Sequence, residues 1–393
     1  MERSLKILFI HPMWYFIRNR ARHCWIYGAG YEENHERLMK LHPGASDAFV
    51  YCLRRLGNEA AIVIYGCDYL QSAWAKEHGL KIPFRDRKAM RFRFRRGVVP
   101  WLEIIDSERW HLSVLAAQIE SFKPDIIFCY AIFAVAVRWL RSVSKPAKLI
   151  AWIGTERVPD LQTLQGYDLI LTLAPKYIPL MRAAGIRADY LPAGFDERML
   201  SYFINPLVRD IPVSFIGSYA SDWGKGLHNT EFVARETGML CYGDSVTDLA
   251  VDSAIRGQYQ GECWGLEMYR VLARSKIVFN RHADVPLDVK GALHDPAEII
   301  RFDQAGNMRL YEATGIGALL VTDRLENLDT LFEPDKEVVT YGTPEEAVEK
   351  IRYYLQNEEK RELIAKAGQE RTLREHTYQD RARQLVDIIN RNL

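Results

Sequence analysis

The chain has 393 residues, which corresponds to about two ordinary domains. Hydrophobic residues make up 48% and charged residues 26%, a globular composition that excludes a disordered, collagen-like or disulfide-scaffold protein. The 52 basic and 51 acidic residues leave a formal net charge of +1, so no overall field points to nucleic acid as a partner.

The cysteines and the apolar runs indicate a cytoplasmic location. The six cysteines form no CxxC pair and have no zinc-ligand spacing, which favours reduced thiols. The apolar stretch near the N-terminus is too short for a signal peptide. The longest apolar run, residues 126–137, is too short to span a membrane.

Strands and helices alternate along the first half. Residues 5–10 form a continuous apolar run, typical of a central parallel strand buried on both faces. A helix is expected from Ser46 to its stop at Gly57. The same reading predicts further strands over 60–65, 126–130, 149–153, 168–173 and 187–191, and helices over 108–122 and 175–184. This alternation predicts a parallel, doubly wound sheet.

A second series of the same kind begins near residue 213. It predicts strands over 213–216, 239–242, 277–280, 318–322 and 338–341, and helices over 266–273, 308–313 and 345–356, with two more helices at the end. The expected fold class is therefore α/β, with two tandem Rossmann-like domains facing a central cleft. The boundaries are an N-terminal domain over 1–196, a linker over 197–211 and a C-terminal domain over 212–375.

Residues that directly follow strands are candidates for binding, because open parallel sheets bind ligands beyond the carboxyl ends of their strands. In the second half, Gly217 and Ser218 follow a strand, and Lys225 stands between two glycines. Such a turn can approach a phosphate closely, although an ordinary surface turn has the same pattern. Asn280 and His282 follow another strand, where the histidine could face the cleft or bond a loop carbonyl.

The segment 306–315 is the sharpest signal. A loop led by Gly306 opens a short helix at Asn307 and Met308, and the free amides of a helix N-terminus suit a diphosphate. Arg309 in the first turn could neutralise an anion, and Glu312 could reach the hydroxyls of a ribose. The alternative is a buried helix in which Glu312 pairs with Arg309 three residues away.

The first half offers candidates for the base and for the acceptor. His11 and Glu156 follow predicted strands, the positions from which a general base would face the cleft. The stretch from Trp14 to Tyr31 combines aromatic rings that stack on sugars with arginines that bind anions. The acceptor candidates within it are Trp14, Arg18, Arg22 and Trp25.

Residues 84–96 form a basic patch with seven basic residues against one acidic residue. The patch could contact anionic lipid, a charged polymer or nucleic acid. Contact with lipid makes peripheral association with the inner membrane face an expectation. The alternative is a solvated face over a packed aromatic edge.

Several motifs are absent. The sequence has no GxGxxG after the first strand, no GxxxxGK[ST], no GxSxG and no DxD carboxylate pair. The absence of these motifs argues against nicotinamide-dependent, ATP-dependent and metal-dependent reactions. Neither a cofactor nor a metal is therefore expected.

The second half resembles a known family. The stretch that begins NMRLYEATGIGALLVTDRLENLDTLFEPDKEVVTYGTPEEAVEKIRYYL and continues to HTY is similar to the donor domain of group 1 (family 4-like) glycosyltransferases. Within that group it most resembles the spore-maturation (CgeB-like) branch. The likeness is specific over about 210–390 and looser before it. It implies the GT-B architecture with a nucleotide-sugar in the cleft.

The resemblance implies roles for individual residues. Glu312 would bond the ribose, the amides at Asn307 and Met308 would hold the diphosphate, and Lys225 with Arg309 would neutralise the leaving group. Gly44 resembles the glycine loop that approaches the phosphate from the N-terminal domain. Where the family has a further glutamate, this sequence has Gln304. The last helix, over 376–393, would pack back on the N-terminal domain.

The predicted function is metal-independent transfer of a sugar from a nucleotide-sugar, of UDP or GDP type, to an acceptor. The acceptor would be an anionic glycan or a lipid-linked or cell-envelope saccharide. Two alternatives stay open: a nucleotide-sugar epimerase of the same fold, and a non-catalytic nucleotide-sugar-binding protein.

Overall fold

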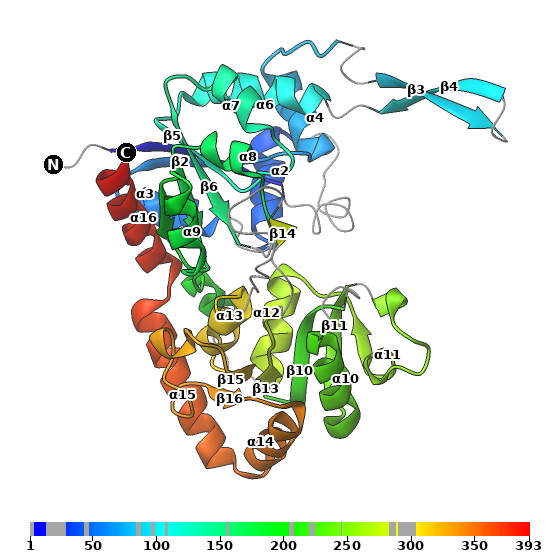
Figure 1. Ribbon diagram of the computed structural model, residues 1–393, viewed down its shortest axis with the longest axis vertical. Helices are drawn as coiled ribbons and strands as arrows, with labels where there is room; N and C mark the ends of the chain where they lie inside the picture. Colours follow the sequence, from blue (N-terminus) through cyan, green and yellow to red (C-terminus); the bar gives the residue numbers. More distant parts are fainter. Residues whose placement is uncertain are drawn as a thin grey trace. The chain divides into compact units, whose positions relative to one another are not determined.

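The computed structural model describes twelve stretches of the chain. They are residues 4–12, 29–42, 47–83, 88–95, 99–106, 109–154, 157–203, 208–219, 225–244, 246–282, 288–289 and 304–393. The chain forms two compact units, one of Met1–Ala151 with Gly166–Asp168 and one of Trp152–Gln165 with Leu169–Leu393. Figure 1 shows the helices and strands of both.

The first sheet has six strands in the order β2-β1-β5-β6-β8-β9. The pairs β1–β2, β1–β5, β5–β6 and β8–β9 are parallel. The strands are β1 (Lys6–His11), β2 (Glu59–Ile64), β5 (Ile126–Cys129), β6 (Lys148–Ile153), β8 (Leu169–Thr172) and β9 (Ala188–Tyr190). The helices between them are α2 (Tyr31–Met39), α3 (Ala48–Arg55), α4 (Asp68–Glu77), α6 (Arg109–Phe122), α7 (Val137–Val143), α8 (Leu161–Gln165) and α9 (Tyr177–Ala183).

The second sheet also has six strands, in the order β12-β11-β10-β13-β15-β16, and its pairings are parallel. The strands are β10 (Ile211–Ser218), β11 (Leu240–Asp244), β12 (Tyr259–Gly261), β13 (Ser275–Phe279), β15 (Leu319–Asp323) and β16 (Val339–Tyr341). The helices are α10 (Lys225–Thr237), α11 (Ala254–Gly257), α12 (Gly265–Arg274), α13 (Met308–Gly315), α14 (Pro344–Gln356), α15 (Glu358–Glu375) and α16 (Tyr378–Asn392).

Four described strands lie outside the two six-stranded sheets. β7 (Arg157–Val158) pairs in parallel with β14 (Asp288–Val289). β3 (Lys88–Arg95) and β4 (Val99–Asp106) form an antiparallel hairpin of their own. Three 3-10 helices complete the described structure, at Glu197–Phe203, Val246–Asp248 and Leu328–Thr330.

The central strands β13 and β15 of the second sheet are largely apolar because both of their faces are covered. On β13, Ile277 and Phe279 join one hydrophobic cluster and Val278 joins the other. β15 divides its side chains in the same way, with Leu320 on the opposite side from Leu319. A parallel strand buried on both faces needs this continuous run rather than an alternating one.

The predicted α/β fold class is confirmed, and every strand predicted above is present within one or two residues of its expected ends. The sequence analysis did not predict helices α2, α4, α8, α10 and α11, strands β7, β12 and β14, or the β3–β4 hairpin. The stretch expected to be a linker contains the 3-10 helix Glu197–Phe203. The predicted domain boundaries stay predictions.

The C-terminal helix is anchored through specific bonds. Thr377 forms a capping box with Asp380 at the start of α16. From α16, Arg381 Nε donates to the Ala193 carbonyl at 2.8 Å, and Gln384 Nε2 donates to the Tyr190 carbonyl at 3.0 Å. α16 therefore lies beside β9 and the segment that follows it.

Candidate functional site

The second sheet has a topological switch point between β10 and β13. From β10 the chain continues to β11 and β12 on one side, whereas β13, β15 and β16 lie on the other. Parallel sheets bind ligands at the carboxyl edge of such a point. Ser218 ends β10 there, and residues 280–282 follow β13 at the same edge.

Asparagine side chains tie helix α13 to this edge. Asn307 Nδ2 donates to Asn280 Oδ1 at 3.0 Å and to the Arg281 carbonyl at 3.1 Å. Asn280 Nδ2 in turn donates to Thr322 Oγ1 at 3.0 Å. Asn280 is 3% exposed, so these bonds supply its polar atoms with partners inside the protein. The network fixes the start of α13 over the ends of β13 and β15.

His282 belongs to the same network. Its Nδ1 lies 2.7 Å from Asp323 Oδ1, and its backbone N–H donates to Asp323 Oδ2 at 2.9 Å. The carboxylate can only accept, so the proton lies on Nδ1, and Nε2 accepts from the Gly306 N–H at 3.3 Å. Burial alone would raise the pKa of Asp323, but the electrostatic interaction with His282 and the hydrogen bonds that the carboxylate accepts outweigh it and lower that pKa. His282 is thus bonded to a carboxylate and an amide.

The N-terminus of α13 has no side-chain cap. Asn307 is the N-cap residue, but its side chain is engaged with Asn280 and Arg281 instead of the first turn. The first turn of this eight-residue helix therefore receives no hydrogen bond from the N-cap side chain. Uncapped amides together with the positive end of the helix dipole favour an anion here.

The loop before α13 packs closely on residues that follow β8. A Cβ at Gly306 would lie 3.2 Å from the Leu173 carbonyl oxygen, so a larger residue would push the loop away. Gln304 Oε1 accepts a hydrogen bond from the Lys176 N–H at 2.8 Å. Both contacts hold the approach to α13 in one place.

Arg309 and Glu312 form an ion pair. Arg309 Nη1 lies 2.8 Å from Glu312 Oε2, and their side chains are 13% and 5% exposed. Burial raises the pKa of Glu312, and the positive charge of Arg309 opposes the rise. This is the i,i+3 pair of the alternative reading, so a ligand that bonds Glu312 would have to share or replace it. The ribose and diphosphate roles of these residues stay predictions.

Arg281 is a site residue that the sequence reading missed. Its Nε donates to Thr230 Oγ1 at 2.8 Å and its Nη2 donates to the Ser218 carbonyl at 3.1 Å, so it spans the switch point. A Cβ at Gly226 would lie 2.6 Å from Arg281 Nη1, which places the cation against the first turn of α10. The sequence did offer a signal for Arg281, because it stands between the two predicted site residues Asn280 and His282, directly after β13.

Gly217 and Lys225 lie where the sequence predicted them along the chain. Gly217 is the next-to-last residue of β10. A Cβ added at this position would lie 2.8 Å from the Phe215 ring. Lys225 is the first residue of α10, and its side chain lies outside the described part of the chain. Their predicted phosphate contacts stay predictions.

The first sheet has its own switch point, between β1 and β5. His11 ends β1, and its ring centroid lies 4.9 Å from that of Tyr130, which follows β5. Burial lowers the pKa of His11 to about 4, so the ring is neutral near pH 7 and can accept a proton, although only as a weak base.

An Asp–His pair at the same edge was missed. Asp68 opens α4 directly after β2, and its Oδ1 lies 2.8 Å from Nε2 of His111 in α6. His111 is 3% exposed, and among the described residues its Nδ1 has no hydrogen-bond partner. Asp68 follows the predicted strand over 60–65, so its place in the sequence carried the same signal as that of the other candidates.

Six predicted site residues lie outside the described residues. They are Trp14, Arg18, Arg22, Trp25, Gly44 and Glu156. Their proposed acceptor, phosphate and base roles therefore stay predictions.

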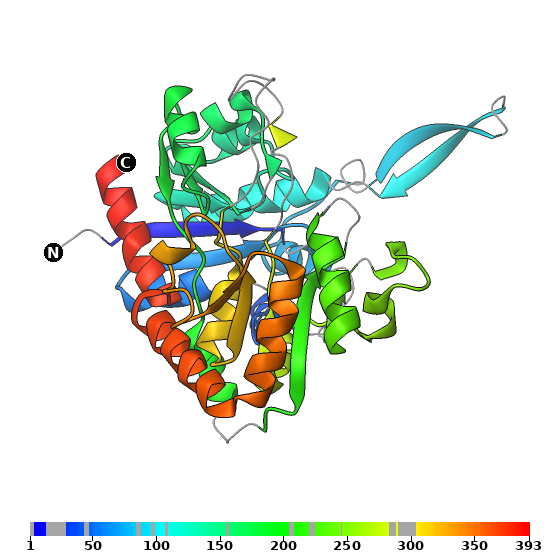
Figure 2. The same cartoon turned by 60° about the horizontal axis from the view of Figure 1, so that its bottom comes forward.

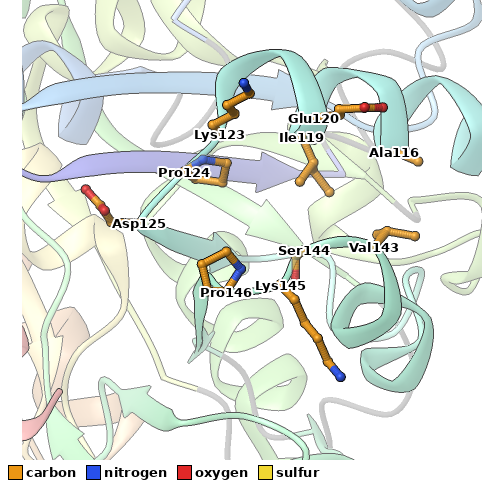
Figure 3. Close-up of a pocket in the computed structure, with 10 residues that line it drawn as sticks. All are labelled: Ala116, Ile119, Glu120, Lys123, Pro124, Asp125, Val143, Ser144, Lys145 and Pro146. Atoms are coloured by element: carbon orange, nitrogen blue, oxygen red, sulfur yellow. The ribbon is translucent and has the colours of Figure 1, made fainter.

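A pocket of about 690 Å³ lies at the opposite edge of the first sheet. It is lined by the ends of α6 and α7 and by the segments that lead into β5 and β6 (Figure 3). The ammonium groups of Lys123 and Lys145 point away from each other, and Asp125 Oδ2 accepts from the Lys6 N–H at 2.9 Å. The pocket lies at the amino ends of its strands, away from the edge where such sheets bind ligands.

In the part of the chain that the structure describes, no helix combines the length and the apolar character needed to cross a membrane. Within the same part, no three His, Cys, Asp or Glu side chains gather as they would around a metal ion. The predicted absence of a metal and the predicted peripheral membrane contact stay predictions.

Comparison with known proteins bears on both halves. Residues 201–387 match the family described as glycosyl transferase-like, which covers slightly less than half of the chain. No curated protein matches the chain in sequence. Solved structures match nearly the whole chain at low identity.

Three of these structures show what the chain is similar to. Sucrose-phosphate synthase from Thermosynechococcus elongatus is 12% identical, with 99% of both chains covered and a TM-score of 0.56. Alr3699/HepE of Anabaena, in complex with UDP-glucose, is 13% identical, with 98% and 100% covered and a TM-score of 0.56. Both of these structures have the GT-B fold, and this chain shares it. AviGT4, a glycosyltransferase involved in avilamycin A biosynthesis, has it too, at 14% identity, 99% and 98% coverage and a TM-score of 0.57.

The expected GT-B architecture is thus confirmed. The second half of this GT-B protein is glycosyltransferase-like in sequence as well as in fold. Its place in the spore-maturation branch stays a prediction.

Proposed function

We propose that this GT-B protein is a metal-independent glycosyltransferase that moves a sugar, of the hexosyl type, from a nucleotide-sugar to an acceptor. The observation that carries the proposal is the uncapped N-terminus of α13, fixed by Asn307 at the switch point of the second sheet. The glycosyl transferase-like match over residues 201–387 supports the same reading.

The chemistry needs stabilisation of a leaving diphosphate. The acceptor oxygen attacks the anomeric carbon, the bond from that carbon to the donor phosphate breaks, and negative charge grows on the nucleoside diphosphate. Amides of α13, with Arg281, Arg309 and Lys225 as nearby cations, would bind that charge more strongly in the transition state than in the ground state.

The acceptor proton has two possible destinations. In an inverting reaction a base in the first half takes it, and His11, Glu156 and the pair Asp68–His111 are the candidates. In a retaining reaction the departing phosphate takes it, and no protein base is required.

The donor is proposed to be a UDP- or GDP-sugar, and the acceptor a glycan or a lipid-linked saccharide. Support for UDP comes from Alr3699/HepE, which is solved in complex with UDP-glucose. A cytoplasmic location with peripheral contact at the inner membrane face fits a lipid-linked acceptor.

The test is a thermal-shift screen of the wild type with UDP, GDP, dTDP, CMP, ADP and their sugar conjugates, beside Glu312→Gln. A ligand at 100 times its dissociation constant should stabilise by about 2.7 kcal/mol. One nucleotide should stabilise the wild type and act much more weakly on Glu312→Gln. Each variant is compared with its own unliganded form, since the loss of the pair with Arg309 lowers stability by itself.

The matched control is Glu345→Gln, an exposed glutamate in the first turn of α14. It should keep the full nucleotide response. A wild type that responds to no nucleotide would contradict the proposal. Isomerised sugar without an acceptor would favour the epimerase, and tight binding without turnover would favour the binding protein.

A further inference from the structure

The β3–β4 hairpin stands apart from the rest of its unit. Among the described helices and strands, none makes more than a marginal contact with either strand. Figure 1 and Figure 2 both show the hairpin as a two-stranded ribbon that reaches away from α4 and α6. At about 3.3 Å per residue, its eight-residue strands are about 25 Å long.

The strand register places apolar residues on one face. Met90 pairs with Ile104, Phe92 with Leu102 and Phe94 with Pro100. Residues two apart on a strand share a face, so these six residues share one side of the ribbon. Charge enters this face only at its base, where Lys88 pairs with Asp106.

The other face is basic. It carries Arg91, Arg93 and Arg95 on β3, and these face Glu103, Trp101 and Val99 on β4. Residues 88–106 as a whole contain five basic and two acidic residues. Ala89, Ile105, Trp101 and Val99 share this face with the charged residues. The hairpin is therefore amphipathic, with one face apolar except at its base and a second face on which three arginines stand beside apolar residues.

An isolated two-stranded hairpin is only marginally stable in water. Its apolar face is therefore expected to bind a partner that removes it from water. The arginines on the second face indicate what kind of partner this is. A nucleic acid or a charged polymer would bind the arginines but would not account for the apolar face. An apolar groove of another protein would bind the apolar face but would not account for the arginines. An anionic bilayer offers acyl chains to one face and phosphate headgroups to the other.

We propose that the β3–β4 hairpin docks the protein on an anionic lipid surface. It lies in the interface with Met90, Phe92, Phe94 and their partners at the acyl boundary and the three arginines in the headgroup layer. The proposal concerns residues 88–106 alone and does not depend on the donor chemistry of the second sheet.

The experiment is flotation of the full chain with vesicles of phosphatidylcholine, with and without 30% phosphatidylglycerol. The wild type should bind the anionic vesicles and not the neutral ones, and binding should weaken in 1 M salt because the charges are screened. Arg93→Gln with Arg95→Gln should weaken binding by about thirtyfold. Phe92→Ser with Leu102→Ser should weaken it by at least about tenfold, since two buried side chains are lost.

Matched controls carry the same substitutions elsewhere. Leu363→Ser removes a 70% exposed apolar side chain of α15, and Arg235→Gln with Arg374→Gln removes two exposed charges. All controls should bind vesicles as the wild type does. The far-UV circular dichroism of the face variants should match that of the wild type, which shows that they are folded without relying on the proposed function.

Several outcomes would overturn the proposal. They are equal binding to neutral and anionic vesicles, loss of binding in the arginine variant alone, and no loss in either face variant. A wild type that binds no vesicles but sediments as a dimer, with Phe92→Ser and Leu102→Ser sedimenting as a monomer, would assign the apolar face to a second copy of the chain instead.

Discussion

His376 shows how one residue can make stability depend on pH. Its Nε2 lies 2.8 Å from the Leu331 carbonyl, and its Nδ1 lies 2.8 Å from Arg381 Nη2. The carbonyl requires a donor and the guanidinium requires an acceptor, so both neighbours select the neutral ring. Burial lowers the pKa of His376 to about 4, and the charges of Arg381 and Arg371 act in the same direction, against Leu331 and Glu375.

We therefore expect stability to fall as the pH drops from about 6.5 to about 4. A histidine in the unfolded chain takes up its proton near pH 6.5, whereas His376 in the folded chain resists until about pH 4. The unfolded state then binds more protons across this window, and the loss approaches ~3 kcal/mol at its lower end. Urea unfolding of the wild type and His376→Gln at several pH values measures it.

The slope of stability against pH should be smaller for His376→Gln than for the wild type. The control is His228→Gln, which changes an exposed histidine of α10 and should leave the slope as it is. Equal slopes in the wild type and His376→Gln would show that the folded ring takes up its proton as readily as the unfolded one.

At the scale of elements, the start of α13 depends on a close approach of two backbones. Gly306 lies so near the Leu173 carbonyl that a Cβ would come within 3.2 Å of the oxygen. The same loop is tied by the Gly306 N–H to His282 and by Gln304 to Lys176. A shift of this loop would carry the first-turn amides of α13 with it.

Gly306→Ala is expected to cost ~1–3 kcal/mol of stability, because the well-packed loop must move to admit a methyl group. It should also weaken nucleotide binding, measured by calorimetry on the folded variant. The control is Gly257→Ala at the end of α11, where an added Cβ meets nothing within 4 Å. That change should be neutral or stabilise by up to ~1 kcal/mol. Equal effects of the two substitutions would contradict the close approach.

At the scale of the whole molecule, every described residue of the proposed donor site lies in the second unit. Hydrogen exchange with and without the stabilising nucleotide tests this location. We expect slower exchange at the first-turn amides of α13 and around Gly226 in α10, because a bound diphosphate would take their hydrogen bonds. Helix α15 should exchange as before. Protection confined to residues 4–151 would place the nucleotide elsewhere.

The site could be predicted only in part, and sequence distance explains which part. Asn307, Met308 and Glu312 lie in one short segment, so a local pattern revealed them. The bonds that position them join residues far apart, such as Asn307 with Asn280 or His282 with Asp323 at 41 residues. Arg281 was passed over because its contact with the first turn of α10 comes from the fold and not from its neighbours in sequence.

The class of the fold follows from local patterns in the chain. Continuous apolar runs such as residues 5–10 specify strands buried on both faces, and glycines and polar loops between them specify where the chain turns. Three features needed the three-dimensional structure: which strand ends meet at a switch point, the ion pair of Arg309 with Glu312, and the two unlike faces of residues 88–106. Periodicity is local and can be read along the chain, whereas strand order and register depend on long-range pairing, which a single sequence does not display.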